Sequence, residues 1–190
     1  MKQTSIMIVG VGGQGTLLAS RLLGAAVLSQ GYDVKVSEVH GMSQRGGSVV
    51  TYVKFGESVA SPIVDMGEAD FILAFEQLEA ARWLPYLKPD GKLVMNTQSL
   101  DPMPVITGAA VYPQGLAGAL EEAGAQVQAI NALSLARQAG SAKAVNVALL
   151  GALARQMAFP KEVWLEAVRS TVKPQFVEMN LQAFELGYGA

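Results

Sequence analysis

The sequence predicts an α/β fold of Rossmann-like type, with a mostly parallel sheet, helices on both faces and a helical C-terminal region. Two patterns carry this prediction. As far as residue 130, short apolar runs rich in β-branched residues alternate with longer segments of helical periodicity. After Asn131 only helical segments follow. No linker, internal repeat or low-complexity tract interrupts the chain, so residues 1–190 are expected to form a single domain.

The predicted strands are apolar runs bounded by glycine, proline or polar residues. They cover residues 4–9, 33–37, 48–55, 69–75, 92–96 and 126–130. Two further short strands are expected, an edge strand at 59–64 that a proline interrupts and a strand at 109–112. Residues 88–91 are expected to form a turn, and residues 100–108, which hold two prolines, a loop.

The predicted helices follow the apolar spacing of 3.6 residues per turn and end near glycine or proline. They cover residues 14–30, 76–87, 115–124, 132–139, 144–157, a segment opened by Pro160, and 175–186. The helix at 144–157 is apolar on most faces, which predicts that it is buried.

The turn between the first strand and the first helix carries the clearest functional pattern. Gly10, Gly12 and Gly15 have the G-x-G-x-x-G spacing of a dinucleotide-binding turn. Such a turn brings the backbone close to an anion, and the N-terminus of the following helix favours negative charge there. The alternative is a glycine-rich turn kept for packing. The predicted ligand contacts of the turn are Gly10, Gly12, Gly13, Gln14 and Gly15.

A nicotinamide site also needs a carboxylate near the end of the second strand, and Glu38 is the candidate. The other interpretation of Glu38 is an ordinary polar residue of the following loop. The sequence has no Tyr-x-x-x-Lys pair or other hydride-transfer pattern. A small NAD(P)-binding oxidoreductase therefore stands as the alternative function.

The loop after the second strand is polar and rich in glycine. Gln44, Arg45, Gly46 and Gly47 are predicted to join the binding site. An arginine guanidinium donates two parallel hydrogen bonds to a phosphate or carboxylate, and the glycines let the backbone come close. The alternative for Arg45 is a surface residue paired with a glutamate.

The only histidine, His40, begins this loop and is either a titrating group or a hydrogen-bonding loop residue. In parallel α/β sheets, ligands bind beyond the carboxyl ends of the strands. By that rule the glycine turn at 10–15, the loop at 38–47 and the region after Phe75 are expected to converge.

Composition narrows the function further. The net charge of −2 gives no electrostatic case for binding nucleic acid or an acidic membrane surface. The absence of cysteine excludes disulfides, iron–sulfur ligation, thiolate zinc sites and a cysteine nucleophile, and it fits a cytoplasmic protein. We assign no catalytic residue and no metal ligand. Charged residues make up 16% of the chain, against about 25% in a typical soluble domain. This shortage predicts a large buried interface with a second copy, as in a homodimer, or with another subunit. The alternative is a very large core.

Three motifs in this order resemble the gamma-type domain of the 2-oxoacid:ferredoxin oxidoreductases. They are Gly-Val-Gly-Gly-Gln-Gly at 10–15, Gln-Arg-Gly-Gly at 44–47 within the loop from Glu38, and Asn-Val-Ala-Leu-Leu-Gly-Ala-Leu-Ala at 146–154. The resemblance covers nearly the whole chain. It is closer to the stand-alone small (beta) subunits of the indolepyruvate-oxidising members.

The resemblance implies an enzyme that decarboxylates a 2-oxoacid, such as indolepyruvate or pyruvate, with coenzyme A, giving acyl-CoA, carbon dioxide and reduced ferredoxin. It implies that thiamine diphosphate and iron–sulfur clusters sit on a larger partner subunit, and ferredoxin is met only indirectly. This chain has no Gly-Asp-Gly run followed by asparagine, the thiamine-diphosphate motif. It is therefore expected to hold no cofactor and to be inactive alone. Its implied roles are subunit assembly and the coenzyme A side of the site, with Arg45 reaching a phosphate or the partner's active site. A module that only docks is the remaining alternative.

Overall fold

The computed structural model describes residues 3–41 and 46–190. They contain one six-stranded sheet with the strand order β2-β3-β1-β4-β5-β6. The strands are β1 (Thr4–Val11), β2 (Asp33–His40), β3 (Ser48–Gly56), β4 (Ala69–Ala74), β5 (Leu87–Asn96) and β6 (Gln126–Ile130). β1, β4, β5 and β6 are parallel neighbours, whereas β3 runs antiparallel to β1 and β2. The predicted mostly parallel sheet is confirmed.

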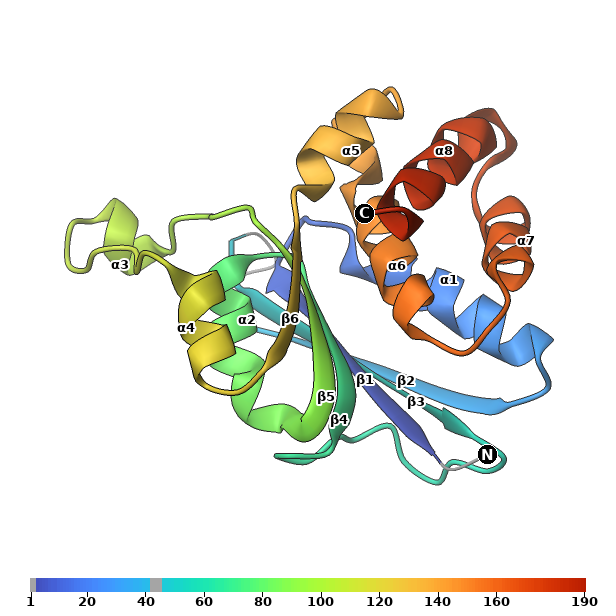
Figure 1. Ribbon diagram of the computed structural model, residues 1–190, viewed down its shortest axis with the longest axis horizontal. Helices are drawn as coiled ribbons and strands as arrows, with labels where there is room; N and C mark the ends of the chain where they lie inside the picture. Colours follow the sequence, from blue (N-terminus) through green and yellow to red (C-terminus); the bar gives the residue numbers. More distant parts are fainter. Residues whose placement is uncertain (1–2, 42–45) are drawn as a thin grey trace.

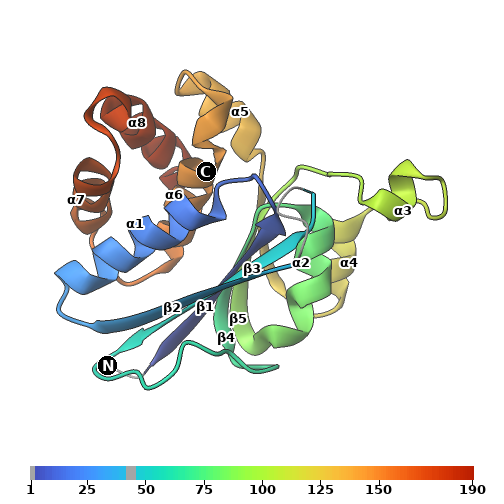
Figure 2. The same ribbon diagram turned by 180° about the vertical axis from the view of Figure 1, so that it is seen from behind.

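Helices cover both faces of this sheet, as predicted (Figures 1 and 2). The α-helices are α1 (Thr16–Ser29), α2 (Gln77–Trp83), α3 (Met103–Ile106), α4 (Leu116–Glu122), α5 (Ala132–Gln138), α6 (Val145–Gln156), α7 (Lys161–Thr171) and α8 (Val177–Tyr188). Short 3₁₀ helices are η1 (Leu84–Tyr86), η2 (Ala142–Ala144) and η3 (Pro174–Phe176). Helices α1, α6, α7 and α8 lie on one face, and α2 and α4 lie on the other.

Alternate residues of the central strand β1 face two different cores. Ile6 and Ile8 join the larger core beneath α1, α6, α7 and α8, and Met7 and Val9 join the smaller one beneath α2. All four are fully buried, because a central strand covered by helices on both faces has no polar side. For this reason residues 6–9 of β1 form an unbroken apolar run in the sequence.

Several local predictions are wrong. Residues 59–64 are irregular, because Pro62 cannot donate a ladder hydrogen bond and the Val59 N–H bonds the Asp33 side chain instead, at 2.9 Å. Residues 109–112 are likewise irregular. Residues 88–91 belong to β5, where the pairing with β4 shifts register between Ala69 and Phe71 and so absorbs the extra residues.

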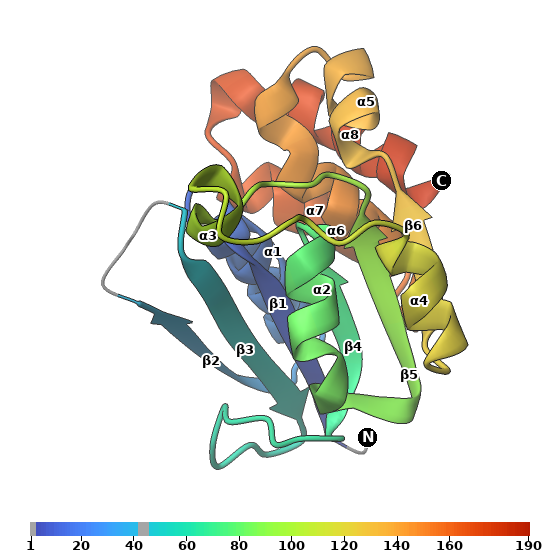
Figure 3. The same ribbon diagram turned by 90° about the vertical axis from the view of Figure 1, so that its left-hand side faces the viewer.

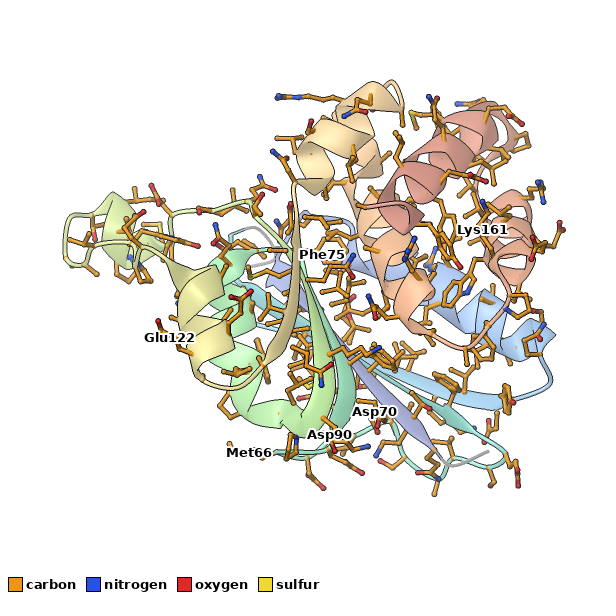
Figure 4. All side chains as sticks on the ribbon, in the orientation of Figure 1. Met66, Asp70, Phe75, Asp90, Glu122 and Lys161 are labelled. Atoms are coloured by element: carbon orange, nitrogen blue, oxygen red, sulfur yellow. The ribbon has the colours of Figure 1, made fainter. Side chains whose placement is uncertain are left out.

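A segment between β5 and α4 leaves the body of the protein and carries α3 at its outer end (Figures 1 and 2). Figure 3 views the molecule from the side of this segment, so α3 lies in front of the body there. The segment was expected to be a plain loop, and it contains this single helical turn. Figure 4 labels Asp70 near the start of β4 and Phe75 directly after its end, which marks the two edges of the sheet. The glycine turn lies at the carboxyl edge, since Val9 and Phe75 are bonded neighbours there.

Candidate functional site

The turn between β1 and α1 has the backbone shape that its glycine spacing predicts. Gly13 and Gly15 have φ values of +100° and +84°, in the left-handed region where a side chain is strained. Gly15 is also the N-cap of α1, and no side chain caps the helix there. The first turn of α1 contains no acidic residue, so its amides and dipole favour an anion in front of them.

Gln14 braces the turn from inside. Its Oε1 accepts a hydrogen bond from the Val11 N–H at 2.7 Å, and its Nε2 donates to the Phe75 carbonyl at 3.1 Å. The side chain therefore ties the end of β1 to the end of β4. Gly10 makes room for it, because a Cβ at Gly10 would lie 2.8 Å from Gln14 Oε1. Gln14 and Gly10, which were predicted to contact a ligand, thus have roles in the internal structure of the turn.

A cleft of about 320 Å³ lies beside the turn, and we call it the glycine cleft. It is lined by Gly12, Gly13, Gly15, Thr16, Leu17, Glu38, His40 and Val49. Glu38 and His40 are both exposed, and Glu38 Oε2 accepts a hydrogen bond from Thr51 Oγ1 at 3.3 Å. The structure thus brings the predicted carboxylate and histidine to the glycine turn. That these residues bind a ligand stays a prediction.

The position of Glu38 differs from that in a nicotinamide site. There the carboxylate follows a strand adjacent to β1. Here β3 lies between β1 and β2, so the strand of Glu38 is one position further out. This places Glu38 about 4.8 Å further from β1 than the nicotinamide arrangement does.

A second hollow of about 260 Å³ borders the turn, and we call it the carboxylate cavity. It is lined by Val11, Gly12, Gly46, Ser48, Glu76, Leu78, Glu79, Arg82, Leu100, Asp101 and Pro102. The side chain of Glu79 is almost fully buried and accepts hydrogen bonds from Ser48 Oγ at 2.5 Å and Arg82 Nη1 at 2.8 Å. These partners stabilise a carboxylate that burial would otherwise make costly.

Glu76 is buried at the junction of β4 and α2 and holds several segments together. Its Oε2 caps α2 by accepting from the Glu79 N–H at 2.9 Å. Its Oε1 accepts from the Leu100 N–H at 3.1 Å and from the Tyr112 hydroxyl. Burial, together with the hydrogen bond to Glu76, raises the pKa of Tyr112 to about 12, so the hydroxyl stays protonated and donating at neutral pH. The sequence pattern did not single out Glu76 or Tyr112.

Comparison with protein-family models matches residues 5–190 to the family described as pyruvate ferredoxin/flavodoxin oxidoreductase. The chain belongs to this family. The resemblance to its gamma-type domain is confirmed, because the gamma subunit of the keto/oxoacid ferredoxin oxidoreductase from Geobacter sulfurreducens has the same fold. That match has a TM-score of 0.73 and 25% identity over 98% of this chain and 96% of the other.

Two curated relatives show how the family uses this unit. The chain is 46% identical to indolepyruvate oxidoreductase subunit IorB of Thermococcus kodakarensis, over 100% of this chain and 96% of that protein. It is 28% identical to ketoisovalerate oxidoreductase subunit VorA of Methanothermobacter thermautotrophicus, over 97% of this chain but only 36% of that protein. In this family the unit therefore occurs both as a separate chain and as about a third of a longer one.

The third family motif, at 146–154, meets the glycine turn through Asn146. This residue is buried at the start of α6, and its Nδ2 donates to the Gly15 carbonyl at 3.2 Å. A hollow of about 340 Å³ lies between Gly13, Gly15 and this end of α6, and it is also lined by Lys143. The motif itself pointed to Asn146, but no local pattern pointed to Lys143.

The structure describes only part of the second family motif, Gln-Arg-Gly-Gly at 44–47. Gln44 and Arg45 lie outside the described residues. Gly46 lines the carboxylate cavity, and the Gly47 carbonyl accepts from the Gly12 N–H at 2.8 Å, so this loop and the glycine turn are joined. Within residues 3–41 and 46–190, no three His, Asp or Glu side chains gather as a metal site. None of the helices in the same ranges has the length and apolarity that crossing a membrane requires.

Proposed function

We propose that this chain is the small, cofactor-free subunit of a 2-oxoacid:ferredoxin oxidoreductase, with indolepyruvate as the first substrate to test. The observation that carries the proposal is the 46% identity with indolepyruvate oxidoreductase subunit IorB along the whole chain. The family match over residues 5–190 supports it. The chain has no cysteine to ligate an iron–sulfur cluster. In the proposed complex, a larger partner subunit carries the clusters and thiamine diphosphate.

The contribution of this chain to the reaction is to hold coenzyme A at the glycine turn. Coenzyme A presents a diphosphate and a 3′-phosphate next to an adenosine. The uncapped N-terminus of α1 lacks an acidic residue, so it suits a phosphate, and Lys143 supplies a positive charge in the neighbouring hollow. The glycine cleft, at about 320 Å³, is within the size range of small-molecule sites. The larger subunit would supply the decarboxylation chemistry and remove the electrons.

NAD(P) is the second candidate ligand, because Glu38 lines the same cleft as the glycine turn. The intervening strand β3 counts against it. The two candidates differ in which residue they need, since coenzyme A depends on a cation for phosphate and NAD(P) depends on the carboxylate of Glu38 for ribose.

To test the subunit assignment, this chain is produced alone and together with the larger subunit of the proposed oxidoreductase from the same organism. We expect coenzyme A-dependent reduction of ferredoxin by indolepyruvate only when both chains are present. Turnover by the isolated chain, or full activity of the larger subunit without it, would contradict the proposal.

The coenzyme A assignment is tested in the complex with Lys143→Ala. Loss of a charge-assisted phosphate contact should raise KM for coenzyme A about tenfold while KM for the 2-oxoacid stays unchanged. Lys173→Ala, in the connection between α7 and α8, is the matched control and should leave both constants unchanged. An unchanged KM for coenzyme A in Lys143→Ala, with NADH binding to the wild-type chain that Glu38→Ala abolishes, would favour the NAD(P) site instead.

A further inference from the structure

The projecting segment between β5 and α4 exposes the apolar side chains of its outer end. We define it as the arm, residues 100–112, with α3 at its tip (Figures 1 and 2). Met103 and Ile106 are each 65% exposed, and Val111 is 89% exposed. Met103 and Ile106 are three residues apart in the single turn of α3, so they point from neighbouring positions of one helical face.

The arm beyond Asp101 and the first five residues of α4 have no charged side chain. Residues 102–120 contain no Asp, Glu, Lys or Arg, although most of them are exposed. Protein interfaces are depleted of charged residues at their centre and enriched in methionine, whereas exposed connecting segments are usually polar and variable. The composition of the arm is therefore that of a surface covered by another protein.

The arm is held in place before any partner arrives. At its two roots, the Leu100 N–H and the Tyr112 hydroxyl both bond the buried Glu76 carboxylate. Within it, the Thr107 N–H donates to the Met103 carbonyl at 2.9 Å and the Ala110 N–H donates to the Pro104 carbonyl at 3.0 Å. A preformed element loses little conformational entropy on binding, which favours its use as a docking element.

We propose that the arm is the docking element for the larger oxidoreductase subunit, which receives Met103, Ile106 and Val111 in an uncharged apolar socket. The inference rests on the proposed function. The longer VorA relative supports this occupant, because there the same unit is joined to about twice its own length of further chain. In our protein a separate larger subunit would take the place of that additional chain.

The arm also adjoins the candidate site. Leu100 and Pro102 line the carboxylate cavity together with Gly12 and Gly46 of the two glycine loops. A partner that binds the arm therefore comes to lie beside the glycine turn, to which the proposed function assigns coenzyme A. Contact with the partner and contact with the ligand are thus expected at the same edge of the sheet.

The test replaces Met103, Ile106 and Val111 together by serine and measures the Kd for the immobilised larger subunit. We expect an increase of about 100-fold, because few residues carry most of the binding energy of an interface. The thermal unfolding midpoint of the isolated variant should match wild type, since all three side chains are exposed. The matched control replaces Ile63 and Met66 by serine. They are 58% and 72% exposed, and Met66 is labelled at the opposite, amino edge of the sheet in Figure 4.

Three results would overturn the inference, and each is distinct. If the triple variant binds the larger subunit as tightly as wild type, the arm is not the docking element, although the proposed function stands. If the triple variant instead dissociates a homodimer of the isolated chain, as seen by sedimentation, the occupant is a second copy. If the wild-type chain fails to bind the larger subunit at all, the proposed function itself fails.

Discussion

Two regions of this molecule depend on glycine for opposite reasons. In the glycine turn, Gly15 has a φ of +84°, so the backbone conformation itself requires glycine. Where α6 crosses α8, Gly151 and Gly187 have helical backbones that any residue can adopt, but there is no room for a side chain. A Cβ at Gly151 would lie 2.2 Å from the Phe184 carbonyl oxygen, and one at Gly187 would lie 1.8 Å from that of Ala148.

The helix crossing also helps to position the glycine turn. The crossing draws α6 and α8 together over the larger core, so α6 is buried along nearly its whole length. The first turn of the same helix carries Asn146, which bonds the Gly15 carbonyl. A tightly packed helix pair thus supports an open turn, and Asn146 is the link between them. We expect the crossing to contribute mainly to stability and the turn to contribute the geometry of the proposed binding site.

The largest expected effect is at the crossing. Gly187→Ala places a methyl group into the backbone of α6, and a backbone carbonyl cannot move aside as a flexible side chain can. The two helices must separate, and we expect the free energy of unfolding to fall by about 3 kcal/mol, at the upper end of overpacking effects. Chemical denaturation of the isolated chain measures this change.

Gly189→Ala is the matched control for this prediction. It lies two residues further along, and the nearest atom to its added Cβ is the Glu185 carbonyl oxygen at 3.5 Å, an ordinary contact. Its unfolding free energy should stay within about 0.5 kcal/mol of wild type. Equal effects of the two substitutions would show that helix propensity, not the close crossing, governs this region.

Alanine substitutions in the glycine turn should lower the unfolding free energy less than Gly187→Ala does. Backbone strain and steric overlap can be measured separately there. Gly13→Ala strains only the backbone, because its added Cβ meets nothing within 4 Å, and should cost about 1–2 kcal/mol. Gly15→Ala adds a contact with Asn146 Nδ2 at 2.7 Å and should cost about 1 kcal/mol more. The difference between the two unfolding free energies measures the cost of displacing the Asn146 side chain. If Gly13→Ala proves the more destabilising, the link through Asn146 is unimportant.

The contrast also explains what could be predicted from the sequence. Six of the eight predicted strands, the buried α6 and the clustered glycines of the turn depend on local patterns, and the structure confirms their positions. Gly151 and Gly187 lie apart in two separate helices, and only the tertiary crossing makes them neighbours. The sequence pattern of either helix alone does not indicate that the two glycines are close. Their role in the α6–α8 crossing could therefore not be predicted from local sequence.

In the candidate site, too, some features follow from local sequence and others depend on tertiary contacts. Glu38 and the glycine turn were predicted to meet because both follow strands, and they line one cleft. The sequence did not reveal that β3 would insert between β1 and β2, because antiparallel pairing of β2 and β3 depends on contacts between whole strands. Glu76 and Tyr112 were missed because their hydrogen bond joins residues 36 positions apart. Ladder pairings and long-range side-chain bonds are set by tertiary structure.

The smallest effect is expected at the link between the two regions. Asn146→Ala removes the hydrogen bond to the Gly15 carbonyl and the bond that Asn146 Oδ1 accepts from the Val147 N–H at 2.9 Å, and it leaves the crossing intact. It should lower the unfolding free energy by about 1 kcal/mol. Because the bond to Gly15 is the one that reaches the turn, hydrogen exchange should accelerate for the amides of Leu18 and Ala19, which donate to that same carbonyl. The amides of α8 should exchange as in wild type. Asn180→Ala is the matched control. Its buried amide donates to the carbonyl of Phe176, the N-cap of α8, at 2.7 Å, so the substitution should change exchange in α8 alone. If Asn146→Ala instead accelerates exchange in α8, the turn and the crossing form one cooperative unit, and the division of stability from binding geometry does not hold.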